Sequence, residues 1–163
     1  MTVGEEKIGV TRRRLPVVEV PTEVLVQVEN VLNRYTYLYD YGNAEQLGHV
    51  FTGDATLDTN PPGLREGLPV TGLENIIEFL GSRYDANELF QRRHVITNLY
   101  ISEYTADRLR SHVYLHVTKS IPGTFAAPDL VLAGEYEDVM VRNADGCWRI
   151  RERLVHEDRM GPH

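Results

Sequence analysis

The sequence lacks several features that define common protein classes. Its 163 residues include one cysteine, Cys147, which excludes an internal disulfide and a cysteine-rich zinc site. Its longest apolar runs are only a few residues, far short of the ~20 that a membrane helix needs. No basic stretch followed by an apolar one opens the chain, so we expect no signal peptide and a cytoplasmic protein.

Basic residues are also fewer than acidic residues. The chain has 17 Lys and Arg against 24 Asp and Glu, a formal net charge of −7. An acidic surface repels nucleic-acid phosphates, so we expect neither a nucleic-acid partner nor a membrane partner.

Sequence signatures of several enzyme classes are missing as well. There is no glycine-rich phosphate loop, no Gly-x-Ser-x-Gly and no histidine or cysteine spacing typical of zinc. We therefore expect no metal and no cofactor.

The length and composition suit one globular domain. Hydrophobic residues make up 42% of the chain, enough for a core with room for a pocket. We expect a polar and basic arm over residues 1–20, a single domain over residues 21–158 and a tail at 159–163.

Helical patterns fill the first half of the domain. Apolar residues recur at three- and four-residue steps from Val24 to Tyr39, after Thr22, which suits an N-cap. A short helix is expected at 44–50. Thr71 and Glu74 form a capping box for another helix that ends near residue 84.

Strand patterns follow a short strand expected at 55–59. Residues rich in strand formers occupy four segments, 94–104, 108–120, 130–142 and 147–157. The short breaks between them indicate hairpins. The order predicts an α+β fold with about three N-terminal helices packed in a curved, mostly antiparallel sheet, and a pocket at the open end of the cone.

Asp40 is the first candidate for chemistry, because it ends a helix among four tyrosines. A carboxylate there meets the unfavourable end of the helix dipole, so it does not serve helix stability. Two interpretations remain: a solvated helix end, or a carboxylate that orients a histidine or acts as a base.

His94 is the second candidate. In strict alternation it shares a strand face with Ile96 and Asn98, which would place two polar groups against an interior. Histidine is the usual general base near neutral pH, although a structural role is the alternative.

The last strand carries three arginines, Arg149, Arg151 and Arg153. Ion pairs with the acidic residues of segment 135–138 are one interpretation. Arg153 lies deeper along the strand and is the better candidate for holding an anionic or polar substrate group.

Two further histidines, His112 and His116, alternate on one face of a strand. They lie about 13 Å apart by strand rise, so they cannot share one metal ion. The sequence leaves open whether either one enters the pocket.

Six motifs follow one another along the chain, at residues 34–43, 47–55, 72–80, 93–98, 134–138 and 145–153. Their order and spacing over residues 22–157 resemble the SnoaL-like branch of the nuclear-transport-factor-2-like superfamily. The resemblance implies a cone-shaped α+β barrel with a deep apolar pocket. It also implies a homodimer formed through the sheet, with a trimer as the alternative.

Members of this branch include polyketide cyclases, scytalone dehydratase, a bile-acid dehydratase and a lindane dehydrochlorinase. Several use a histidine and an aspartate to move a proton. By resemblance, His94 and Asp40 would form that pair, with Tyr35 as a catalytic pocket tyrosine and Arg153 as a pocket arginine. The strand segment 113–117 has no acid where the bile-acid dehydratase has one.

Three more residues are expected to contact substrate: Tyr39, Asn98 and His116. Tyr39 and Asn98 would donate hydrogen bonds to a developing oxyanion. Either His112 or His116 is a candidate for the second histidine of scytalone dehydratase.

These expectations converge on a cofactor-free lyase, cyclase or isomerase. It would abstract a proton from a small, apolar, carbonyl-bearing or cyclic substrate in secondary metabolism or catabolism. A non-catalytic small-molecule-binding module is one alternative, and it predicts that His94 is not paired with Asp40. A partner protein like the small subunit of ring-hydroxylating dioxygenases is another, and it predicts a large apolar outer sheet face.

Overall fold

The computed structural model describes residues 15–83 and 90–158. Most of the predicted arm and the predicted tail lie outside these residues, so those two segments stay predictions. The elements are α1 (Thr22–Asp40), the 3-10 helix η1 (Ala44–His49), β1 (Phe51–Asn60), β2 (Val70–Thr71), α2 (Leu73–Ser82), β3 (Gln91–Tyr104), β4 (Arg108–Ser120), β5 (Asp129–Arg142) and β6 (Trp148–Glu157).

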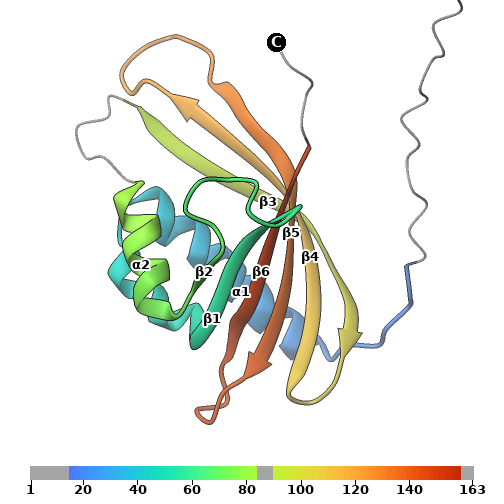
Figure 1. The fold of residues 1–163 in the computed structure, drawn as a ribbon. Helices are drawn as coiled ribbons and strands as arrows, with labels where there is room; N and C mark the ends of the chain where they lie inside the picture. Colours follow the sequence, from blue (N-terminus) through green and yellow to red (C-terminus); the bar gives the residue numbers. More distant parts are fainter. Residues whose placement is uncertain (1–14, 84–89, 159–163) are drawn as a thin grey trace, which may run out of the picture.

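The sheet has six strands in the order β2-β1-β6-β5-β4-β3. Strand β1 pairs parallel with β6, and every other neighbouring pair is antiparallel. Figure 1 shows the sheet curving around α1, with α2 beside the β1 end of the sheet. The predicted α+β architecture with a curved, mostly antiparallel sheet is confirmed.

The core lies between the helices and the concave face of the sheet. Helix α1 contributes an apolar stripe whose members recur at three- and four-residue steps, as the sequence predicts. The largest fully buried apolar side chains are Trp148, Phe51, Leu32, Leu47, Ile76, Leu109, Leu115, Met140 and Ile150. No helix within the described ranges is long and apolar enough to cross a membrane.

The capping-box prediction for α2 is wrong in detail. Thr71 pairs with Thr56 in the short strand β2, so it is held in the sheet. Gly72 takes the N-cap position instead, with φ +91°, and its N–H donates to the carbonyl of Ala55. Glycine reaches this left-handed region without the steric cost that a Cβ adds.

Two irregularities in the strands decide which side chains reach the interior. The register of β3 against β4 shifts between Thr97 and Tyr100, and Asn98 has φ +59°. In β6 both Arg151 and Glu152 are exposed, so the inward alternation resumes at Arg153. A single extra residue moves all following side chains to the opposite face.

Candidate active site

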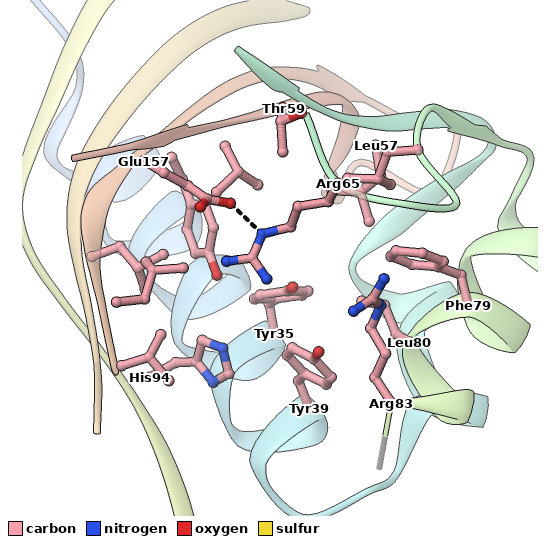
Figure 2. Close-up of a pocket in the computed structure, with 16 residues that line it drawn as sticks. Tyr35, Tyr39, Leu57, Thr59, Arg65, Phe79, Leu80, Arg83, His94 and Glu157 are labelled. Carbon is pink, nitrogen blue, oxygen red and sulfur yellow. Dashed lines mark hydrogen bonds and ion pairs between the residues drawn. The ribbon is translucent and has the colours of Figure 1, made fainter. Parts of the chain in front are cut away.

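A cavity opens between the concave face of the sheet and the two α-helices. Its volume is about 100 Å³, several times the space that one water molecule needs. Figure 2 shows side chains from both helices, the sheet and the 61–69 loop converging on it. The lining is mainly apolar and aromatic: Tyr35, Tyr39, Leu57, Leu68, Phe79, Leu80, Leu115, Val117, Leu132, Tyr136 and Val155, with Thr59, Arg65, Arg83, His94 and Glu157.

Asp40 and His94 meet at the edge of this cavity. The carboxylate Oδ1 of Asp40 lies 2.5 Å from Nδ1 of His94, and Oδ2 accepts the backbone N–H of His94 at 2.8 Å. Both side chains are only 6% exposed. The two contacts fix the end of α1 against the start of β3, so the fold unites residues that are far apart in the sequence.

This contact assigns the tautomer of His94. A carboxylate only accepts hydrogen bonds, so Nδ1 carries a proton, and in the neutral imidazole Nε2 keeps its lone pair. Nε2 has no hydrogen-bond partner within residues 15–83 and 90–158. Figure 2 shows the imidazole directed toward the rings of Tyr35 and Tyr39, and the Tyr39 ring centroid lies 4.8 Å from that of His94. The arrangement can accept a proton from a bound molecule.

Tyr35 and Tyr136 form the floor of the cavity. Their rings meet edge-on with centroids 5.8 Å apart. Burial raises the pKa of Tyr35 to about 12, although the neighbouring Arg153 guanidinium opposes the rise. Burial also raises the pKa of Tyr136 well above its usual range. Both hydroxyls therefore stay protonated at neutral pH, and a hydrogen bond joins the two side chains.

These raised pKa values predict an alkaline loss of stability. The folded protein retains the Tyr35 proton above pH 10 while the unfolded chain releases it, so stability falls as pH rises from about 10 to 12. Tyr35 alone contributes about 2 kcal/mol to this fall by pH 11.5. Urea unfolding at pH 9 and pH 11.5 measures it. The Tyr35→Phe variant should lose less stability over this range than the exposed control Tyr37→Phe, and equal losses would contradict the assignment.

The position of Arg153 does not support its expected role in binding an anionic substrate group. Its Nε and Nη2 both donate to the Asp138 carboxylate at 2.7 Å, and both side chains are buried. Its guanidinium carbon lies 4.1 Å from the ring centroids of Tyr35 and Tyr136. Arg153 thus supports the tyrosine floor from behind and is absent from the cavity lining.

The other two basic residues of β6 pair elsewhere. Arg149 forms an ion pair with Asp145 at 2.6 Å, and Arg151 approaches Asp54 at 3.4 Å. The expected pairing of Arg149 and Arg151 with the acidic residues of segment 135–138 is therefore wrong. Arg153, expected to bind substrate, is the arginine that pairs there.

Two expected substrate contacts lie away from the cavity. Asn98 is exposed, because the irregularity in β3 breaks the alternation that would have turned it inward. His116 is exposed on the outer face, because Val113, Leu115 and Val117 are the inward residues of β4. Tyr39, by contrast, lines the cavity as expected.

Sequence reasoning missed the polar residues at the cavity mouth. Arg65 comes from the 61–69 loop, Arg83 follows α2 and Glu157 ends β6. Arg65 donates through Nε to the carboxylate of Glu157. The only sequence signal for them was the proline- and glycine-rich 61–63 segment, which marks a loop but not the direction of its side chains.

The outer face of the sheet holds a group that resembles metal ligands. Ligand atoms of His112, Glu135 and Glu137 lie within 4.8 Å of one another. They already bind protein groups: His112 Nδ1 meets Glu135 at 2.7 Å, and Arg110 donates to Glu137 at 2.6 Å. These contacts account for the group as an ion-pair network across β4 and β5.

Comparison with known proteins agrees with this architecture. Residues 22–154 match the SnoaL-like domain family. Among solved structures, ActVI-ORFA from Streptomyces coelicolor shares 22% identity at a TM-score of 0.73, covering 84% of this chain and 98% of that one. A Catenulispora acidiphila protein in complex with S-DNPA shares 24% identity at a TM-score of 0.70, covering 85% and 96%.

A third similar structure is a scytalone dehydratase-like protein from Novosphingobium aromaticivorans. It shares 17% identity at a TM-score of 0.67, covering 86% of this chain and 89% of that one. No curated protein matches the chain. Identities this low establish a shared fold and leave the chemistry to be argued from the site.

Proposed function

Because the chain belongs to the SnoaL-like family, we propose that it is a lyase, cyclase or isomerase whose base is His94. Asp40 holds the imidazole in the tautomer that leaves Nε2 able to accept a proton. The observation that carries the proposal is the 2.5 Å contact between Asp40 Oδ1 and His94 Nδ1 at the edge of an apolar cavity.

The proposed reaction begins with a proton on a carbon beside a carbonyl, or on a hydroxyl. His94 Nε2 takes this proton, and the Asp40 carboxylate stabilises the resulting imidazolium. Burial of both side chains excludes water, which strengthens their interaction. The imidazolium then returns the proton to a leaving hydroxyl, to the alkoxide formed by ring closure, or to another carbon.

The negative charge that develops on the substrate oxygen needs donors. Tyr35 and Tyr39 present hydroxyls to the cavity, and burial raises the pKa of both, so they remain protonated donors. Loss of water gives an alkene, attack on a second carbonyl gives a ring, and reprotonation elsewhere shifts a double bond. In all three outcomes the protein's own side chains move the proton and donate the hydrogen bonds.

The two alternatives have less support. A binding module without catalysis does not explain why His94 is paired with Asp40 and open to the cavity. A dioxygenase-type partner subunit predicts an apolar outer sheet face, whereas an ion-pair network including Arg110, His112 and Glu137 crosses this one. Homodimer formation through the sheet stays a prediction.

The test is a screen in D2O of small aromatic β-hydroxyketones and β-diketones, followed by mass spectrometry. Dehydration, or cyclisation followed by loss of water, removes about 18 Da. Ring closure without loss of water and isomerisation keep the mass of the compound, so they are recognised by a changed chromatographic retention, and deuterium uptake is compared with a sample without protein. We expect turnover of at least one compound by the wild type, and loss of it in His94→Gln. The matched control is His49→Gln, because His49 is exposed on η1. A wild type that converts nothing, or a His94→Gln variant at full rate, would contradict the proposal.

A further inference from the structure

Two arginines reach the mouth of the cavity from separate elements. Arg65 lies in the 61–69 loop, and Arg83 directly follows α2. Both belong to the cavity lining. Figure 2 shows their guanidinium groups pointing into the space near Tyr35, Tyr39 and Phe79. The cavity lining thus carries two guanidinium groups against one carboxylate, that of Glu157.

The charge of Arg83 is not neutralised by a carboxylate within residues 15–83 and 90–158. Its guanidinium carbon stacks 4.3 Å from the ring centroid of Phe79, and its Nη2 donates to the backbone carbonyl of Glu66 at 3.0 Å. The helix dipole favours a cation at the end of α2. The helix dipole explains why a basic residue follows α2, but it does not explain why the Arg83 side chain turns into the cavity.

Arg65 is only partly engaged. Its Nε donates to the carboxylate of Glu157, and no other hydrogen bond of its guanidinium occurs among the described residues. Its side chain is 43% exposed, whereas Glu157 is 12% exposed. A guanidinium has five N–H donors, so the two Nη groups remain available for an anion in the mouth.

From this arrangement we propose that the substrate is a small cyclic or aromatic carboxylate. This inference rests on the proposed function and names the substrate class of the same site. The carboxylate binds Arg83 and the free Nη groups of Arg65, since guanidinium groups match carboxylates with paired, charge-assisted hydrogen bonds. The ring lies among Tyr39, Phe79 and the aliphatic lining, and the opposite end of the molecule reaches His94.

Glu157 acquires a definite role under this proposal. It holds Arg65 in place while the pocket is empty, and it competes with the incoming carboxylate for the same guanidinium. Removing its charge should therefore tighten binding of an acid. A pocket that selects only by apolar contact would not respond in this way.

The test compares trans-cinnamate with its neutral amide, trans-cinnamamide, by titration in two-dimensional NMR. We expect the acid to bind the wild type roughly tenfold or more tightly than the amide, the range for a charge-assisted hydrogen bond. Arg83→Gln should weaken acid binding toward the level of the amide and leave the amide unchanged. Glu157→Gln should strengthen acid binding. The control is Arg151→Gln, which lies outside the cavity lining and should change neither.

Several results would overturn the proposal. They are equal affinity for acid and amide, failure of both to bind, or acid affinity that Arg83→Gln leaves unchanged while its spectrum remains that of a folded protein. The His94→Gln variant separates this proposal from the proposed function. It keeps both arginines, so it should retain the preference for the acid over the amide while losing turnover of the compound found in the screen. Failure of recognition and failure of catalysis therefore appear in different measurements.

Discussion

Replacing Asp40 with Asn should lower turnover by about 10²–10⁴-fold, the usual contribution of general acid–base catalysis. The asparagine amide can donate to Nδ1 of His94, which favours the tautomer with its proton on Nε2. That tautomer cannot take a proton from the substrate. The neutral amide also fails to stabilise the imidazolium that forms during the reaction.

The rate of any compound found in the D2O screen measures this effect. Asn keeps one oxygen that can accept the backbone N–H of His94, so the junction between α1 and β3 is preserved. The matched control is Asp54→Asn on β1, whose carboxylate is 66% exposed. An Asp40→Asn variant that works at the wild-type rate would show that the pair holds the structure together without acting in catalysis.

Replacing Arg153 with Met should lower the free energy of unfolding by about 3–5 kcal/mol. The substitution leaves the Asp138 carboxylate buried without its cation, and the side chain of Asp138 is only 1% exposed. The rings of Tyr35 and Tyr136 also lose the guanidinium packed against them. Urea denaturation measures the change.

Arg149→Met on the same strand is the control for this experiment. Its partner Asp145 is 49% exposed, so the loss should stay below about 1 kcal/mol. The double variant Arg153→Met with Asp138→Leu should recover much of the stability, because it removes both buried charges together. Equal effects of Arg153→Met and Arg149→Met would refute the importance of the buried pair.

The fold could be predicted from the sequence because its signals are local. The boundaries of the four strand segments predicted after residue 90 lie within three residues of the observed boundaries of β3, β4, β5 and β6. Turn residues such as those of 143–146 mark the hairpins between them. The parallel pairing of β1 with β6 joins strands about 100 residues apart, and no local pattern encodes it. The same holds for β2, which consists of two residues.

The site was predictable in part. Asp40 and His94 stood out by residue type and by family resemblance, and the fold brings them into contact. The expectation for Asn98 assumed strict alternation, which an irregularity in β3 breaks. Such irregularities depend on tertiary packing and left no recognisable signal. Arg153 does turn inward, but Asp138 occupies its guanidinium. Arg65, Arg83 and Glu157 were missed because no local pattern shows that their side chains turn toward the cavity. A loop positions Arg65, the end of α2 positions Arg83, and the irregularity in β6 positions Glu157.

The most direct test of the proposed base is the tautomer of His94, read from its two ring nitrogens by 15N NMR at a pH where the imidazole is neutral. This measurement needs no substrate. We expect a proton on Nδ1, hydrogen-bonded to Asp40, and an unprotonated Nε2 facing the cavity. In Asp40→Asn the proton should move to Nε2. A wild-type His94 with its proton on Nε2 would contradict the account, because the nitrogen assigned as the base would already be occupied.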